Sequence, residues 1–136
     1  MANEIDPKFG ELITLHFLLA NVPANATTDL TLPGTNAGLL VPTGYEFHPV
    51  FLQISSNADL TAGTATAKVT ADGTELAKGP APVLSDTVQS ASAVVRFGLE
   101  PIAAGDVVGV SVTTTAAFAP TTADVDAILA GYLVPA

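Results

Sequence analysis

Several residue types are rare or missing in this sequence, and each absence narrows what the protein can do. The chain has no cysteine, which excludes disulfides, thiolate metal sites and cysteine nucleophiles. Its two histidines are too few for a histidine metal site. It has no tryptophan and two tyrosines, and so lacks the aromatic faces that usually bind a sugar ring.

Basic residues are also scarce. Four lysines and arginines against 13 acidic residues give a net charge of −9, a sign that repels nucleic-acid phosphates and anionic lipid headgroups. No apolar stretch approaches the roughly 18 residues of a membrane-spanning helix. We therefore expect neither nucleic acid nor a membrane as a partner. The first seven residues, MANEIDP, are acidic where a secretory signal is basic and then apolar, so we expect synthesis in a cytoplasm without a signal peptide.

The charged fraction is low for a chain of this kind. Charged residues make up 12% of the sequence, about half the usual share, and hydrophobic residues make up 49%. We expect something other than water to cover part of the surface, although an alanine-rich core is the simpler explanation. The 136 residues fit a single domain that buries roughly two thirds of its extended surface.

Alternating polar and apolar residues predict β-strands. Between residues 63 and 73, the threonines, Lys68 and Asp72 lie in one phase, and Ala65, Ala67, Val69 and Ala71 lie in the other. Asp72-Gly73 then supplies the positive φ angles of a tight hairpin turn, so we expect a return strand over residues 75–77.

Four further runs are typical of strands. Residues 13–19, 93–99 and 107–113 alternate, with Phe17 among the apolar positions of the first run. Residues 45–54 are apolar in both phases, which predicts a central strand covered on both sides, its second cover being another subunit. The expected faces of this strand are Tyr45, Phe47 and Phe51 on one side and Val50, Leu52 and Ile54 on the other.

Residues 123–133 are expected to close the fold as a strand, because their 3.6-residue periodicity is poor and Gly131 and Pro135 disfavour a helix. The sequence therefore predicts an all-β protein: a single antiparallel β-sandwich of about eight strands over residues 11–136. Residues 1–10 form an N-terminal arm that mixes charge, proline and two apolar anchors, Ile5 and Phe9.

No residue pattern indicates catalysis. There is no glycine-rich phosphate loop and no Gly-x-Ser-x-Gly elbow. His16 occupies the polar phase of its strand and His48 precedes Pro49, so both are expected at a surface or strand edge. Solvated turn acids are the favoured interpretation of the carboxylates, and a calcium site is the weaker alternative at two pairs, Asp124 with Asp126 and Asn57 with Asp59. We expect no catalytic residue, metal or cofactor.

Two segments resemble small structural proteins of tailed bacteriophages. Residues 60–74, LTAGTATAKVTADGT, are similar to a hairpin of these proteins, and residues 102–110, IAAGDVVGV, are similar to the strand that follows it. Such segments occur within a jelly-roll-like sandwich, in head decoration proteins and in fibre or collar modules. The resemblance covers about residues 40–115.

The resemblance implies a capsid decoration, or cement, protein rather than an enzyme. Such a protein would be a homotrimer on the outer capsid surface of the virion, where it would bind the major capsid protein of an expanded head and bridge neighbouring capsomers. It would be made in the host cytoplasm. The N-terminal arm would then contact the capsid or a neighbouring subunit through Ile5, Lys8 and Phe9, the alternative being a frayed terminus.

Two other functions remain open. One is a tail-fibre, collar or receptor- or sugar-binding module, which needs a concave polar or aromatic patch on its loops, whereas these loops are mostly Ala, Thr, Gly and Pro. The other is a small hydrolase with an unrecognised carboxylate pair, which ranks last.

Overall fold

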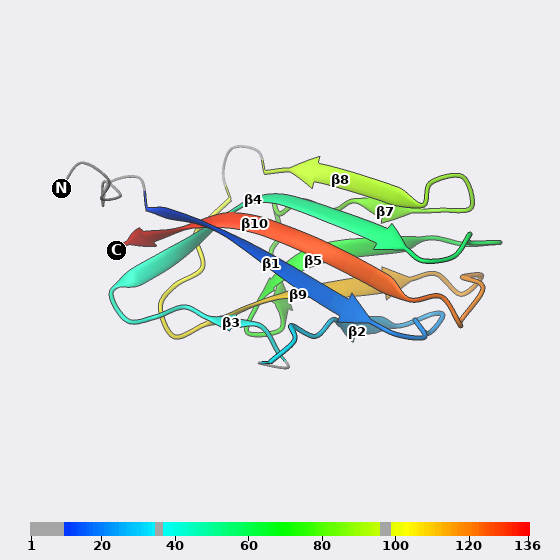
Figure 1. The fold of residues 1–136 in the computed structure, drawn as a ribbon, viewed down its shortest axis with the longest axis horizontal. Helices are drawn as coiled ribbons and strands as arrows, with labels where there is room; N and C mark the ends of the chain where they lie inside the picture. Colours follow the sequence, from blue (N-terminus) through cyan, green and yellow to red (C-terminus); the bar gives the residue numbers. More distant parts are fainter. Residues whose placement is uncertain (1–9, 35–36, 96–98) are drawn as a thin grey trace.

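The computed structural model describes residues 10–34, 37–95 and 99–136, and these contain ten β-strands (Figure 1). The strands are β1 (Glu11–Leu19), β2 (Thr27–Asp29), β3 (Leu39–Leu40), β4 (Tyr45–Ser56), β5 (Ala65–Ala71), β6 (Thr74–Glu75), β7 (Val83–Leu84), β8 (Ser90–Val94), β9 (Val107–Thr114) and β10 (Val125–Pro135). Within the same residues, no helix has the length and hydropathy needed to cross a membrane.

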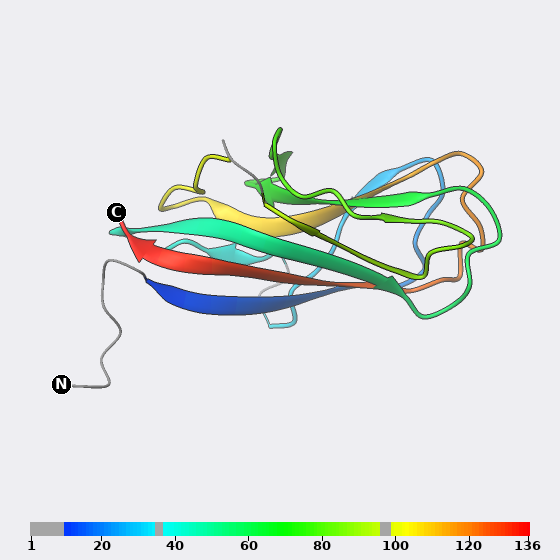
Figure 2. The ribbon, with the colours of Figure 1, turned by 90° about the horizontal axis from the view of Figure 1, so that it is seen from above.

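The strands form two antiparallel sheets that pack face to face, as the view from above shows (Figure 2). The four-stranded sheet has the order β1-β10-β4-β8. The six-stranded sheet has the order β2-β9-β5-β6, with β3 also paired to β9 and β7 to β5. The first and last strands are therefore neighbours, joined along a register from Glu11 opposite Leu133 to Leu19 opposite Val125.

The chain passes between the two sheets at most of its connections. It leaves β1 for β2, enters β4 from β3, crosses again to β5, and later crosses from β7 to β8, from β8 to β9 and from β9 to β10. This is the connectivity of a jelly roll, in which two Greek keys share two sheets. The predicted all-β, antiparallel sandwich is confirmed; three two-residue strands, β3, β6 and β7, account for most of the difference from about eight strands.

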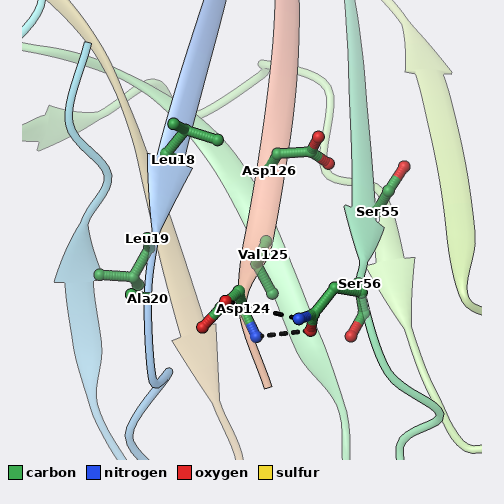
Figure 3. A pocket seen from close by; sticks show the side chains of 9 residues that line it. Leu18, Leu19, Ala20, Ser55, Ser56, Asp124, Val125 and Asp126 are labelled. Atoms are coloured by element: carbon green, nitrogen blue, oxygen red, sulfur yellow. Dashed lines mark hydrogen bonds between the residues drawn. The ribbon is translucent and has the colours of Figure 1, made fainter. Parts of the chain in front are cut away.

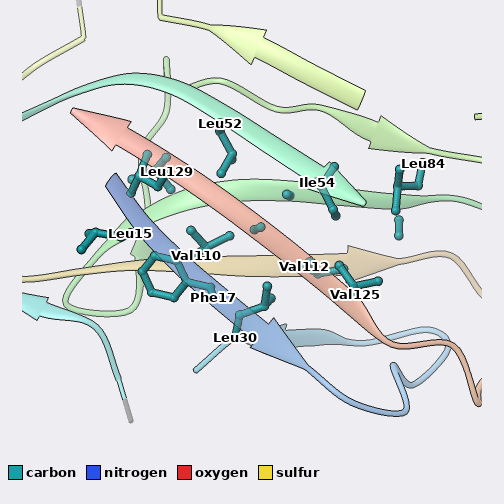
Figure 4. Close-up of a cluster of buried hydrophobic side chains, with 14 of the residues drawn as sticks. Leu15, Phe17, Leu30, Leu52, Ile54, Leu84, Val110, Val112, Val125 and Leu129 are labelled. Atoms are coloured by element: carbon teal, nitrogen blue, oxygen red, sulfur yellow. The ribbon is translucent and has the colours of Figure 1, made fainter. Parts of the chain in front are cut away.

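The space between the sheets is filled by one apolar cluster (Figure 4). Alternation places Leu15 and Phe17 of β1 in it, opposite Val110 and Val112 of β9 on the other sheet. Leu129 of β10 is likewise fully buried. Because each strand contributes every second residue to this cluster, the alternation read for residues 13–19 and 107–113 is confirmed.

The predicted hairpin is present at the end of β5. Asp72 and Gly73 have φ angles of 51° and 81°, the two positive values of a tight turn. In β5 the apolar residues Ala65, Ala67 and Val69 are buried as expected. Thr70, in the polar phase of the same strand, is also buried. Its partner in β9 is Gly109, and Ala37 lies over the same position, so the Thr70 side chain is covered. The return strand is Thr74–Glu75, shorter than residues 75–77 and one residue earlier.

The expected faces of the strand over residues 45–54 are wrong, because β4 contains a β-bulge. Its pairing with β10 shifts between Ala130 and Gly131, which lie opposite Phe51 and Pro49, so Val50 is an extra residue. The extra residue reverses the phase of the strand. Consequently the buried side chains are Phe47 before the bulge and Leu52 and Ile54 after it. The strand is central, as predicted, with β10 on one side and β8 on the other.

The strand predicted over residues 93–99 begins earlier than expected. The observed strand is β8, Ser90–Val94, paired with β4 from Ser55 to Phe51. The amide of Val95 donates a hydrogen bond of 2.8 Å to the Val50 carbonyl, which extends the pairing by one residue. Phe97, an expected core residue, lies outside the described residues. The closing strand predicted over residues 123–133 is confirmed as β10.

Candidate functional site

The predicted contact residues Ile5, Lys8 and Phe9 lie outside the described residues, as does most of the arm assigned to residues 1–10; the first described residue is Gly10, and β1 begins directly after it. The division of the chain into an arm and a sandwich domain therefore stays a prediction. The candidate site described below lies instead on the sheet that starts with β1.

The outward side chains of the four-stranded sheet form a continuous face, here called the four-stranded face. The register gives its rows across the strands: Leu12, Tyr132 and His48; Thr14, Ala130, Phe51 and Val94; His16, Ile128, Gln53 and Ser92; Leu18, Asp126, Ser55 and Ser90. The first two rows and the bulge residue beside them are mostly apolar. The last two rows become polar toward the other end of the sheet.

The apolar rows are open to solvent. Leu12 is 57% exposed and Val94 is 62% exposed, while Tyr132 and Val50 are 39% and 37% exposed. These side chains and their half-buried neighbours form an apolar patch, and the largest apolar patch on a soluble monomer is often functional. The cover expected over β4 is therefore not supplied by the described part of the chain.

Both histidines of the protein lie on the four-stranded face, each beside a carboxylate. His16 Nε2 is 3.2 Å from Asp126 Oδ2, across the β1–β10 pair. His48 Nε2 is 3.1 Å from Glu46 Oε1, on β4. Both rings are substantially exposed, which confirms the expected surface position of these residues. The described lysines, Lys68 and Lys78, lie on β5 and after β6, away from this face.

The outward face of the six-stranded sheet, here called the six-stranded face, is polar. Thr27 and Thr113 are joined by a hydrogen bond of 2.9 Å between their hydroxyl oxygens. The buried Ser111 hydroxyl donates to Glu75 Oε2 at 3.1 Å, and Lys68 Nζ lies 3.8 Å from Glu75 Oε1. Many polar side chains of this face thus pair with one another, but Leu40 on β3 and Val83 on β7 are 60% and 42% exposed on the same sheet.

A groove of about 380 Å³ lies where β1 and β4 end and β10 begins, and where their loops meet (Figure 3). Asp124 and Asn57 hold these loops together. The Asn57 side-chain oxygen accepts from the Asp124 amide at 2.8 Å, and the Asp124 carboxylate accepts from the Asn21 amide at 3.0 Å and from the Asn57 side-chain amide at 3.4 Å. These polar groups are thus occupied by the loops themselves.

The first pair of carboxylates considered for calcium, Asp124 and Asp126, is engaged in other contacts. Asp126 pairs with His16, and the Asp124 carboxylate is committed to the loop hydrogen bonds. Residues 10–34, 37–95 and 99–136 contain no group of three His, Asp or Glu side chains that could hold a metal ion. The groove therefore serves to fix loops at this end of the sandwich.

Two carboxyl groups, those of Asp72 and Asp106, lie close together in the six-stranded sheet, where β5 ends and β9 begins. Partial burial, together with the charge and hydrogen bond of the Asp72 carboxyl beside it, raises the pKa of Asp106 above its usual value. The Asp72 carboxylate also accepts a hydrogen bond of 2.7 Å from the Val107 amide. This pair of carboxyl groups connects the β5–β6 turn to the start of β9 and therefore has a structural role.

Three apolar residues could have predicted the four-stranded face from the sequence, but the strand prediction did not take them into account. Leu12, Leu18 and Val94 occupy the phase of their strands that alternation assigns to solvent. Large apolar side chains at solvent positions of several neighbouring strands predict an interaction surface. Recognising it required the pairing of β1, β10, β4 and β8, which the residue order alone does not give.

Comparison with known proteins finds likeness at the level of the fold. No family model matches the sequence, and no curated protein matches it. Among solved structures, the chain resembles a chain of the cyanophage Pam1 capsid asymmetric unit, with a TM-score of 0.55 and 17% identity over 93% of this chain and 86% of that one.

Two further structures have the same fold. One is vertex protein P5 of PRD1, with a TM-score of 0.53 and 13% identity over 88% of this chain and 96% of that one. The other is a chain of a native-like genome-containing particle of DWV, with a TM-score of 0.52 and 12% identity over 94% of this chain and 80% of that one. At these identities the likeness establishes a shared sandwich fold.

Proposed function

We propose that this chain is a non-catalytic structural protein of a virus particle. More specifically, it acts as a decoration protein that binds the outside of an expanded phage head as a trimer, contacts the major capsid protein and bridges capsomers. The single observation that carries the proposal is a jelly-roll sandwich, of the fold found in capsid and vertex proteins, with an uncovered apolar face on one sheet.

The chemistry of the described residues supports a binding role rather than catalysis. The two imidazoles pair with carboxylates on an open sheet face. The polar groups of Asn57 and Asp124 form hydrogen bonds between their own loops. A general base needs a substrate held beside it in a site that excludes water. Neither histidine lies in such a site.

Decoration stabilises a shell through mass action. A ligand that binds the expanded shell and not its disassembled parts stabilises the shell by its binding free energy at each site. In this scheme the N-terminal arm contributes a capsid or subunit contact through Ile5, Lys8 and Phe9. The acidic chain, with its net charge of −9, would also be repelled by the packaged genome.

The test uses expanded heads assembled without this protein. Full-length protein is expected to co-sediment with the heads at a saturable ratio and to raise the temperature at which they release DNA. Absence of both effects contradicts the decoration role. Deletion of residues 2–9 is expected to weaken binding, and undiminished binding by the deletion variant rejects the contact assigned to Ile5, Lys8 and Phe9.

One observation favours a second location. The fold similarity to vertex protein P5 of PRD1 supports a place at a vertex, collar or fibre as the alternative. Electron micrographs of particles with and without the protein separate the two. Added knobs over the faces of the head support decoration, whereas density confined to the vertices or tail supports the alternative.

A further inference from the structure

We propose that the four-stranded face is the surface through which this protein associates with a second copy of itself, sheet against sheet. The proposal rests on the proposed function, in that it names one contact between subunits; because both copies use the same face, this contact joins two copies and a trimer requires a further contact. Three features of the sandwich support it: the area of the face, its small side chains and its charge.

The area of the face suits a protein partner of this size. Strands lie about 4.8 Å apart and rise about 3.3 Å per residue, so three strands of nine to twelve residues plus the shorter β8 cover roughly 590 Å² as a flat sheet. Side-chain relief increases this area toward the roughly 800 Å² that each partner buries in a stable interface. The face is therefore large enough to hold two copies together without a ligand between them.

The side chains of the face allow close approach. Small residues, Thr14, Ala130, Ser55 and Ser92, lie between the large apolar ones in the rows given by the register. Two sheets pack at about 10 Å when the side chains between them interdigitate. Leu12 and Val94 lie on the two edge strands of the face, β1 and β8. Their large side chains therefore project on both sides of the central strands β10 and β4.

Charge selects a second copy over a basic partner. The whole chain carries a net charge of −9, so most approaches of two copies are repulsive. On the four-stranded face the two acids, Asp126 and Glu46, lie 3.2 Å and 3.1 Å from histidines, which offset their charge when the rings are protonated. The six-stranded sheet carries four acids, Asp29, Glu75, Asp72 and Asp106, and of these Glu75 has Lys68 at 3.8 Å. A basic partner would be drawn to that sheet, whereas two copies meet least repulsion at the four-stranded face.

The main experiment places a charge on the face and measures the mass of the full-length protein. Leu12→Glu and Val94→Glu are tested separately by sedimentation and light scattering between about 1 and 100 µM. The matched control is Leu40→Glu, because Leu40 is 60% exposed, close to the 57% of Leu12, but lies on β3 of the other sheet. Circular dichroism and thermal unfolding establish that each variant is folded.

The wild-type protein and L40E are expected to associate at least into dimers in this range, because a contact that uses the same face on both copies joins two of them. L12E and V94E are expected to associate at least about tenfold more weakly, because each buries an unpaired carboxylate in the contact. A wild-type monomer at every concentration overturns the inference, as does an oligomer that L40E disrupts and L12E and V94E leave intact. Head binding by wild-type protein distinguishes failure of this contact from failure of the decoration role.

A second measurement avoids charged substitutions. Because the chain has no cysteine, a single introduced thiol reports its own surroundings. The Val94→Cys thiol is expected to react with maleimide several-fold more slowly as protein concentration rises, whereas Val83→Cys, on β7 of the other sheet, keeps a constant rate. Equal behaviour of the two thiols contradicts the proposed contact.

Discussion

The two outward faces of this sandwich are built by the same alternation of residues but end with opposite surfaces. On the six-stranded face, threonine, serine, lysine and glutamate side chains pair with one another. On the four-stranded face, the outward positions include Leu12, Val94 and Tyr132, which have no comparable cover among the described residues. The difference lies in the extent of exposed apolar surface, which involves all four strands of one sheet and, among the described residues of the other, is limited to Leu40 and Val83 on the short strands β3 and β7.

The β-bulge in β4 is what gives the four-stranded face its composition. Without the extra residue Val50, the strand would keep one phase, and Phe47 could not share the core with Leu52 and Ile54. The bulge allows all three to face inward and places Phe51 in the outward row with Ala130 and Val94. A feature of backbone pairing thus decides which apolar side chains form the core and which form the surface.

The largest expected effect comes from Gly131→Ala, at this bulge. A Cβ on Gly131 would overlap the Phe47 ring and come within 2.6 Å of the His48 carbonyl oxygen, so either the bulge or the ring must move. We expect a loss of about 3 kcal/mol in the free energy of unfolding, in the upper range for an overpacked core. Urea unfolding followed by circular dichroism measures it.

Gly79→Ala is the matched control for Gly131→Ala. Gly79 also has an ordinary φ angle, and its nearest neighbour to an added Cβ is Leu76 Cβ at 3.4 Å, an ordinary contact. Its stability is expected to change by less than about 0.5 kcal/mol. Equal stability of the two variants would show that the close packing of Phe47 against β10 does not hold the bulge in place.

A smaller effect is expected for Glu75→Ala, on the six-stranded face. The substitution leaves the buried Ser111 hydroxyl without its acceptor and removes the ion pair to Lys68. A loss of about 1 kcal/mol follows, mostly from the hydroxyl, because exposed ion pairs contribute little. Glu75→Gln keeps an acceptor oxygen and should recover most of the stability in the same unfolding measurement. If either variant altered the oligomeric mass, the assignment of self-association to the opposite face would be wrong.

How well each part of this fold could be predicted depends on how far apart in the sequence the interacting residues lie. The hairpin at Asp72-Gly73 and the alternation around Phe17 depend on neighbours in sequence, and both were predicted. The phase of β4 depends on a bulge formed against Gly131, about 80 positions later, and it was predicted wrongly. The apolar face was missed for the same reason, since its rows combine four strands from separate parts of the chain.

The smallest expected effect belongs to Asp106→Asn, at the acidic edge of the six-stranded sheet. Partial burial and the neighbouring Asp72 carboxyl raise the pKa of Asp106 in the folded protein. The folded state therefore binds this proton more tightly than the unfolded state, and its contribution to stability is lost as pH rises through the raised pKa. At pH 7 the wild-type protein keeps the repulsion between two carboxylates, which the asparagine removes.

Asp106→Asn should therefore unfold at a slightly higher temperature than wild-type protein at neutral pH, and its advantage should shrink as pH falls through the raised pKa of Asp106, because protonation of that carboxyl removes the same repulsion. Thermal unfolding of both proteins across this range measures the difference, in which contributions from the other acids cancel. Asp72→Asn combined with Asp106→Asn should add little, because either change alone removes the repulsion. A difference that stays constant with pH would assign the effect to the new amide hydrogen bond, and the acidic edge would then contribute nothing to the contrast between the two sheets.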